Sequence, residues 1–373
     1  MKARPIIAIA IVQSVFCLAY WFLYRTWIDF WWPVSPAAAL ALRIALSVLS
    51  VSFVVAMVLS FRFSNPLVRL IYRIASVWLG LSNFLFVAAC LAWLTDLLLR
   101  LLLSANIRIA ARPLIAGAFL LSAVGTAIYG MLNARYIRQR HLTVRLPNLP
   151  EAWHGRTALL ISDMHLGHIN GARFAGRIAA MARQLNPAMI FIAGDLYDGA
   201  KIEPATQAAP LSELSPPLGI WFVGGNHEEF GGAAHYEDAL RRAGIRVLHN
   251  ERVVVDGLQI LGVPYGQSTH PIQLRAFLEG LNLKNASASI LLNHVPGQLS
   301  IAEHAGVSLQ LSGHTHGGQF FPFSWVTRRA FGKFTYGLQR FGDMQVYTSS
   351  GAGTWGPPMR VGTHPEIVLL TFE

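Results

Sequence analysis

The sequence predicts a membrane region of about four N-terminal helices followed by a separate α/β domain. Charge is the first observation behind this prediction. Residues 1–141 contain thirteen of the 30 Lys and Arg residues but only two acids, so they carry the whole net charge of +11. Residues 142–373 hold seventeen residues of each sign, and all 13 histidines lie from His141 onward. A basic, apolar region is therefore joined to a neutral, histidine-rich region that is long enough to bury its own core.

Four apolar runs in the first region are long enough to cross a bilayer, because about 20 helical residues span roughly 30 Å of hydrocarbon. We expect these spans near Pro5–Tyr24, Ala37–Phe61, Ile74–Leu94 and Pro113–Leu132. Between the third and fourth spans, the stretch Asp96–Arg112 mixes leucines with three arginines. That mixture predicts a segment that lies along the membrane interface without crossing it.

The basic residues that flank the spans predict the orientation. Nine lie at the N-terminus, in the second loop and after the fourth span, against four in the first and third loops. Because cytoplasmic loops carry the excess of Lys and Arg, we expect a multi-pass protein of the inner or plasma membrane with its α/β domain in the cytoplasm. The alternative is that Lys2–Tyr24 is a cleaved signal peptide, which would place the domain outside. Its long apolar region, with no small-residue cleavage site after it, disfavours that alternative.

The stretch after the fourth span is basic and then contains Pro147 and Pro150, which is typical of a connection between domains. We therefore assign residues 1–141 to the transmembrane region, 142–155 to a linker and 156–373 to the α/β domain.

Within the α/β domain, short apolar runs first alternate with helical patterns and later follow one another closely. Helices are expected at Arg173–Leu185 and Ala234–Ala243. The expected strands are Thr157–Ile161, Met189–Ala193, Gly219–Val223, Arg252–Val255, Gln259–Val263, Ser289–Leu292, Val307–Leu311, Gln345–Thr348 and Ile367–Phe372. This order predicts two sheets packed face to face.

Five of these runs end in side chains that bind metals. The side chains are Asp163 and His165, Asp195, Asn226 with His227, His294, and His314 with His316. Sites in α/β sheets gather at the carboxyl ends of strands. Mixed carboxylate, amide and imidazole ligands at such an edge predict a hydrolytic centre of two divalent cations, which would activate water and clamp a phosphoryl group.

The spacing of these residues suggests their individual roles. Asp163 and His165 can both face one cation, and Asp195, which follows a glycine, is placed to bridge both cations. Asn226 supplies a neutral carbonyl oxygen. His227 adjoins a ligand without needing to be one, and is well placed to stabilise developing charge or to protonate the leaving oxygen. Seven other histidines are assigned to the core or the surface: His154, His168, His235, His249, His270, His304 and His364.

This set of motifs resembles the calcineurin-like metallophosphoesterase superfamily, whose pattern is Asp-x-His, Gly-Asp, Gly-Asn-His-Asp/Glu, a later His and Gly-His-x-His. The resemblance covers about Arg156–Glu373 with every ligand position filled, and only Glu228 stands where the family often has Asp. It implies a four-layer α/β/β/α sandwich and two divalent metals, often Mn, Fe or Zn.

Each role of the family falls on a matching position of this chain. By the resemblance, the first metal is held by Asp163, His165 and His316, and the second by Asn226, His294 and His314. Asp195 bridges the two metals, and His227 is the acid near the leaving group.

Three further segments point to one branch of this superfamily. They are Gly317–Gln319, Ser349–Gly353 and Trp355–Arg360. They are similar to a membrane-associated branch that includes cell-wall-linked phosphodiesterases and UDP-2,3-diacylglucosamine pyrophosphatases. This implies cleavage of phosphodiester or pyrophosphate bonds in a lipid-linked or nucleotide-linked substrate. The apolar run Phe320–Trp325 is either a hydrophobic lip that meets acyl chains or a buried turn, and we favour the lip.

Other functions stay open on the sequence alone. A phosphomonoesterase or nucleotidase would use the same centre. A membrane scaffold with an inactive domain is less favoured, because such domains usually lose a ligand and none is missing here. A nuclease is disfavoured since the neutral domain offers no basic groove for nucleic acid, and a transporter is disfavoured since the spans lack acids in their middles.

The orientation is testable with a reporter that is active only outside the cytoplasm. Fused to the C-terminus, the reporter should be inactive, whereas the same reporter fused in the first loop, near Pro33, should be active. Strong activity of the C-terminal fusion would contradict the predicted orientation and favour the signal-peptide alternative.

Overall fold

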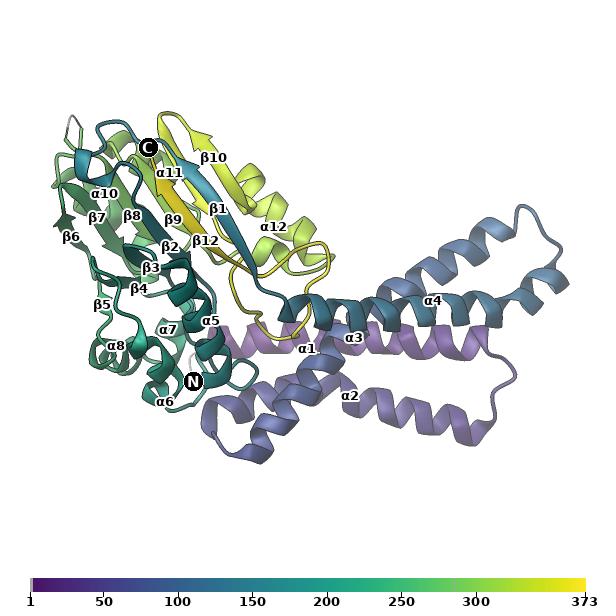
Figure 1. Cartoon of the computed structure of the whole chain (residues 1–373). Coiled ribbons are helices and arrows are strands. Elements are labelled where there is room, and N and C mark those ends of the chain that lie inside the picture. Colours follow the sequence, from purple (N-terminus) through teal and green to yellow (C-terminus); the bar gives the residue numbers. More distant parts are fainter. Residues whose placement is uncertain (1–2, 285) are drawn as a thin grey trace. The chain divides into compact units, whose positions relative to one another are not determined.

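The computed structural model describes residues 3–284 and 286–373 and divides into two compact units (Figure 1). One comprises Met1–Leu132 with Gly356–Met359, and the other Asn133–Trp355 with Arg360–Glu373. Lys2, one of the basic residues counted for the orientation, lies outside the described residues.

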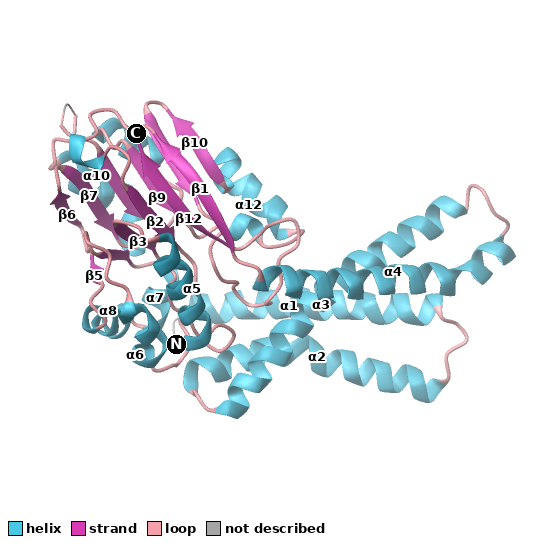
Figure 2. Ribbon diagram, in the orientation of Figure 1, coloured by secondary structure: helices cyan, strands magenta, loops and turns pink. Residues whose placement is uncertain are grey.

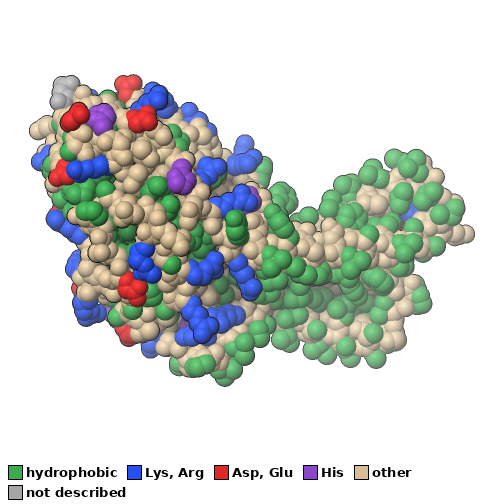
Figure 3. Space-filling model, viewed as in Figure 1, with side chains coloured by type: hydrophobic (Ala, Val, Ile, Leu, Met, Phe, Trp, Pro, Cys, Tyr) green, Lys and Arg blue, Asp and Glu red, His purple; other side chains and the backbone are tan. Residues whose placement is uncertain are grey.

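Four long helices form the first unit: α1 (Ala3–Phe30), α2 (Pro36–Arg62), α3 (Pro66–Leu99) and α4 (Ala105–Arg135). Each is long and apolar enough to cross a membrane, α1 over Ile9–Phe30. Large apolar side chains cover their visible surface (Figure 3), with Leu18 67% and Leu121 73% exposed. So extensive an apolar surface is unfavourable in water. The four predicted apolar helices are confirmed as helices that are long and apolar enough to cross a membrane.

Local capping explains where two of these helices begin. Ser35 accepts a hydrogen bond from the backbone N–H of Ala38, and Asn65 accepts one from Val68. A proline follows each cap at the first helical position, where no backbone N–H is needed.

The predicted interfacial segment Asp96–Arg112 is wrong. Asp96 lies inside α3, whereas Arg108 and Arg112 belong to α4. The side chain of Asp96 is buried and accepts hydrogen bonds from both arginines, at 2.6 to 3.0 Å. The helices extend beyond the apolar runs because each charge finds a partner of opposite sign, which removes the cost of burying a lone ion.

The second unit is a four-layer sandwich of two six-stranded mixed sheets with helices outside (Figure 2). Its strands are β1 (Arg138–Val144), β2 (Thr157–Ile161), β3 (Met189–Ala193), β4 (Ile220–Val223), β5 (Arg246–Val247), β6 (Glu251–Val255), β7 (Leu258–Val263), β8 (Ser289–Asn293), β9 (Leu309–Ser312), β10 (Gly337–Phe341), β11 (Met344–Thr348) and β12 (Glu366–Phe372). Its helices are α5 (Ala172–Leu185), α6 (Pro204–Ala208), α7 (Asn226–Gly231), α8 (Ala233–Arg242), α9 (Tyr265–Ser268), α10 (Pro271–Glu279), α11 (Leu299–Ala305) and α12 (Phe323–Phe331).

The strand order is β1-β12-β2-β3-β4-β5 in one sheet and β10-β11-β9-β8-β7-β6 in the other. Strands β2 to β5 run parallel, and so do β7, β8, β9 and β11. The carboxyl ends of neighbouring parallel strands therefore share one edge of each sheet, where the candidate ligands follow.

Alternation along the strands separates three apolar layers. Leu159 and Ile161 of β2 pack towards α5 and α8, whereas Ala158 and Leu160 face the layer between the sheets. A third layer lies between the second sheet and the helices α10 and α11. This arrangement confirms the predicted four layers, and it follows from the period of two that a strand imposes on its side chains.

The predicted linker 142–155 is shorter in the structure, because its first residues continue strand β1, which pairs in parallel with β12. Of the seven residues in β1, only Val144 is buried. A strand at the edge of a sheet with mostly exposed polar side chains carries little apolar periodicity, so the sequence pattern gave no strand there.

Candidate metal centre

The candidate ligands follow the ends of five parallel strands, β2, β3 and β4 of one sheet and β8 and β9 of the other, in loops or, for Asn226, at the start of α7. These loops bring together the seven predicted ligands and His227. Side chains of the set form three overlapping groups in which potential ligand atoms lie within 4.8 Å of one another. The groups are Asp163 with His165 and His316; His165 with Asp195 and His227; and Asp195 with His294 and His314.

The first group converges tightly. Nε2 of His165 lies 3.0 Å from Nε2 of His316, which is 3.5 Å from Oδ1 of Asp163. Ligand atoms that each sit about 2 Å from one cation lie about 3 Å apart, so this spacing matches a shared cation.

Asp195 belongs to the two remaining groups. Its Oδ2 lies 3.1 Å from Nε2 of His294 and 3.9 Å from Nε2 of His165. Nδ1 of His314 lies 3.0 Å from the side-chain oxygen of Asn226. Asp195 therefore stands between the two groups, where a bridging carboxylate would be needed.

The residues fit a pair of divalent cations. Nδ1 of His294 lies 2.8 Å from the carbonyl oxygen of Ala193, which can only accept, so Nδ1 carries a proton and Nε2 is the nitrogen that a cation would bind. That Nε2 is buried and makes no hydrogen bond among the described residues. An orphaned, correctly oriented imidazole nitrogen among carboxylate and amide oxygens is the donor chemistry of Mn, Fe or Zn sites.

Burial and neighbouring charges shift the pKa values of the candidate ligands. Burial lowers the pKa of His165 and His316 and brings that of His314 to about 4, so these imidazoles are neutral at pH 7. Burial alone would raise the pKa of Asp195, but His294 and its histidine neighbours lower it below the usual range. The same carboxylate outweighs burial at His294 and raises its pKa to about 10. A cation would replace that proton.

The backbone is held in an unusual conformation at these positions. Five of the seven predicted ligands have positive φ between 48° and 68°: Asp163, His165, Asp195, His314 and His316. Non-glycine residues seldom adopt this region, and strained conformations concentrate at functional sites. Each residue turns its side chain sharply out of the end of a strand, which lets both sheets deliver ligands to one place.

Two glycines permit the backbone to touch the carboxylates. A Cβ atom at Gly225 would lie 2.2 Å from Oδ1 of Asp195, and one at Gly313 would lie 2.2 Å from Oδ2 of Asp163. Any side chain at either position would push a carboxylate out of the centre, which explains why Gly precedes Asn226 and His314.

His227 is positioned by two hydrogen bonds. Its backbone N–H donates to Oδ1 of Asp195 at 3.0 Å, and its Nδ1 lies 3.0 Å from the carbonyl oxygen of Asp198. Because that carbonyl only accepts, Nδ1 carries the proton and Nε2 remains available for proton exchange. Burial lowers the pKa of His227.

The sequence interpretation missed three supporting residues. Glu228 is buried and accepts from the backbone N–H groups of Asp195, Tyr197 and Gly225, at 2.7 to 3.0 Å. Oδ1 of Asp198 lies 3.5 Å from Nδ1 of His165, on the side of the ring away from the Nε2 that lies near His316. Asp198 could have been predicted from the sequence, because it lies only three residues after Asp195.

Arg360 is the third such residue. It is fully buried and donates to the carbonyl oxygens of His316 at 2.9 Å and Ser350 at 2.7 Å. Its Nη2 lies 3.1 Å from Nδ1 of His316, and this guanidinium adds to the burial that keeps His316 neutral. Gln319 completes the arrangement through two 3.1 Å hydrogen bonds with the backbone of Trp355. Arg360, in one of the segments singled out in the sequence, thus supports the last ligand, His316.

Comparison with known proteins gives the family. Residues 156–318 match the family model described as calcineurin-like phosphoesterase. The chain is 31% identical over 322 residues to a transmembrane protein with metallophosphoesterase domain from Danio rerio, covering 80% of this chain and 71% of that protein. The chain belongs to the calcineurin-like phosphoesterase family. A metallophosphoesterase of Aquifex aeolicus is also 31% identical over 256 residues, which is 67% of this chain and 97% of that protein.

A solved dimetal phosphatase from Danio rerio superposes with a TM-score of 0.34 and 12% identity over 53% of this chain and 88% of that chain, a likeness too low to support any argument. Membership of the calcineurin-like phosphoesterase family is confirmed, and the long apolar helices indicate a membrane-associated metallophosphoesterase. The clustered ligands agree with a dimetal centre.

Replacing Glu228 by Gln should destabilise the protein by about 1–3 kcal/mol, because the amide brings N–H donors to a place where three backbone N–H groups need acceptors. Denaturant unfolding of the detergent-purified protein measures the change. The matched control is Glu279→Gln, an exposed residue in an i,i+4 pair, where the expected change is below about 0.5 kcal/mol. Equal effects of the two substitutions would contradict the proposed support by Glu228.

Proposed function

We propose that this protein hydrolyses phosphodiester or pyrophosphate bonds of a lipid-linked or nucleotide-linked substrate, with a dimetal centre carried by residues 156–373. The observation that supports it best is the complete donor set, in which Asp195 lies within 4.8 Å of ligand atoms from both sides of the centre. No predicted ligand is displaced from the group, which disfavours an inactive scaffold.

The proposed assignment gives each side chain one task. The first metal would be held by Asp163, His165 and His316, the second by Asn226, His294 and His314, with Asp195 bridging. When bound, two divalent cations of Mn, Fe or Zn would supply Lewis acidity and an activated water at neutral pH. The mixed oxygen and imidazole ligands do not select one of these metals.

The chain's own residues would complete the reaction. His227, whose Nδ1 is held by the carbonyl of Asp198, would in its imidazolium form give a proton through Nε2 to the leaving oxygen. The carbonyl oxygen of Ala193 holds the ring of His294 through Nδ1, and this leaves Nε2 of that ring for a metal.

A substrate near the bilayer would suit the exposed apolar run at the entrance to α12. Phe321 is 56%, Phe323 52% and Trp325 61% exposed, only a few residues after His316. This exposure favours a hydrophobic lip over a buried turn, although Phe320 itself is buried. With the predicted cytoplasmic orientation, the lip would meet acyl chains at the cytoplasmic face of the membrane.

Hydrolysis of bis-p-nitrophenyl phosphate by the detergent-purified full chain tests the activity. Turnover should require Mn²⁺, disappear with chelator, and fall by about 100-fold or more in Asp195→Asn, beyond the usual 10–100-fold effect of an outer-shell partner. Asp238→Asn, an exposed carboxylate on α8, is the matched control and should keep full activity.

Two other outcomes would favour a different function. Two bound metals with no diester turnover would favour the phosphomonoesterase or nucleotidase alternative, which a screen of monoesters would then measure. Fewer than one metal per chain under replete conditions would contradict a dimetal enzyme and favour a scaffold.

The hydrophobic lip has its own test. Phe321→Ser and Trp325→Ser should lower turnover of a lipid-linked diphosphate severalfold, while turnover of the soluble diester stays the same, because only the lipid loses apolar contact. Val254→Ser, at an exposed apolar side chain on β6, is the control. An unchanged ratio between the two substrates would contradict a role for this run in lipid contact.

A further inference from the structure

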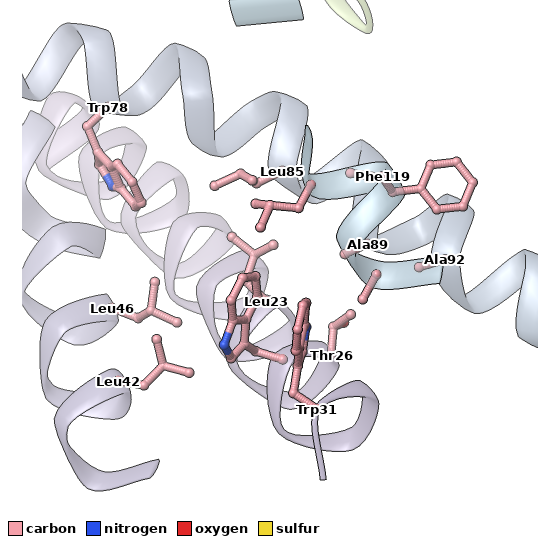
Figure 4. Close-up of a pocket in the computed structure, with 14 residues that line it drawn as sticks. Leu23, Thr26, Trp31, Leu42, Leu46, Trp78, Leu85, Ala89, Ala92 and Phe119 are labelled. Atoms are coloured by element: carbon pink, nitrogen blue, oxygen red, sulfur yellow. The ribbon is translucent and has the colours of Figure 1, made fainter. Parts of the chain in front are cut away.

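A partly open cavity of about 210 Å³ lies between the helices of the helical unit, far along the chain from any metal ligand (Figure 4). All four helices contribute to its walls. They do so near the end of the unit where α1 and α3 finish and where α2 and α4 begin. Leu23, Leu42, Leu85 and Phe119 are typical of the lining, which is almost entirely apolar.

The size and lining of this cavity suit a hydrocarbon chain. An apolar cavity of roughly 150 Å³ stays dry and accepts a molecule such as benzene. This cavity is larger and its helices are built to lie in a bilayer, where acyl chains are the abundant apolar species.

A cluster of charges stands one helical turn beyond the cavity wall. Asp96 follows the lining residue Ala92 by four positions in α3, and Arg112 precedes the lining residue Ala116 by four positions in α4. Asp96 lies 2.6 Å from Arg108, 2.9 Å from Arg112 and 3.9 Å from Arg100. One carboxylate against three guanidinium groups leaves a net charge of +2 at the end of a membrane helix bundle.

Shared side chains join the charged cluster to the cavity. The guanidinium of Arg112 lies over the rings of Phe30 and Trp93, at 5.4 and 5.7 Å. Trp93 in turn donates to the hydroxyl of Thr26 at 2.9 Å, and Thr26 lines the cavity. The apolar and the cationic parts therefore belong to one continuous structure.

One hydrogen-bond donor in the cavity wall has no acceptor among the described residues. The indole Nε1 of Trp31 is buried and makes no hydrogen bond among the described residues. A buried N–H without an acceptor is unfavourable, and an ester carbonyl at the head of an acyl chain would satisfy it.

We propose that the helical unit binds one anionic glycerophospholipid at this place. One acyl chain occupies the cavity, the ester carbonyl accepts from Trp31, and the phosphate lies against the three arginines. A zwitterionic lipid offers the same chain without net negative charge, so the excess positive charge selects the anionic class. This site is independent of the proposed hydrolytic activity and of the metal centre.

Native mass spectrometry of the full chain, released from detergent after equilibration with equal amounts of phosphatidylglycerol and phosphatidylcholine, tests the proposal. We expect one phosphatidylglycerol per chain to be retained in preference to phosphatidylcholine. Arg100→Gln, whose side chain is 53% exposed and only 3.9 Å from Asp96, should lower that retention about fivefold, the effect of about one interfacial charge. Arg62→Gln, at the far end of α2, should leave it unchanged.

Filling the cavity provides a second variant that keeps every charge. Ala116→Phe should abolish retention of the lipid, whereas Ala118→Phe, at an exposed position of α4 outside the lining, should not. Unchanged metal-dependent turnover and an unchanged melting temperature would show that these variants are folded.

Three results would overturn the proposal. They are equal retention of the two lipids, full retention of phosphatidylglycerol in folded Ala116→Phe, and displacement of the lipid by millimolar inorganic phosphate. The last would show that the arginines bind a free anion and that the acyl chain contributes nothing.

Discussion

The carboxylate of Asp195 is the group on which the centre depends. It lies against His294 and His165, accepts the backbone N–H of His227, and receives its own backbone support from Glu228. Because burial opposes an isolated charge, this carboxylate can stay ionised only while imidazoles or cations surround it. The surrounding loops from both sheets are therefore constrained together, and displacement of one ligand would alter the charge balance of all the others.

Much of this arrangement followed from the sequence. The strands β2, β3, β8 and β12 were predicted within a residue or two because each is a short apolar run. The ligands were predicted together because each ends such a run, and the structure gathers them at one edge. The family was recognised from the same motifs.

The remaining features lacked a local signal. Edge strand β1 carries polar side chains on both faces, and the buried Asp96 looked interfacial because its partners lie 12 and 16 residues further along the chain. Arg360 and Glu228 act through backbone groups that only the folded chain brings near them. The left-handed conformation of five ligands is likewise set by both sheets and not by the residue types alone.

The donor set of the centre contains oxygen and imidazole nitrogen but no sulfur. The two cysteines of the chain, Cys17 and Cys90, lie instead in α1 and α3. Thiol oxidation therefore has no ligand of the centre to attack. Any sensitivity of this enzyme to thiol oxidants would have to originate in its membrane helices.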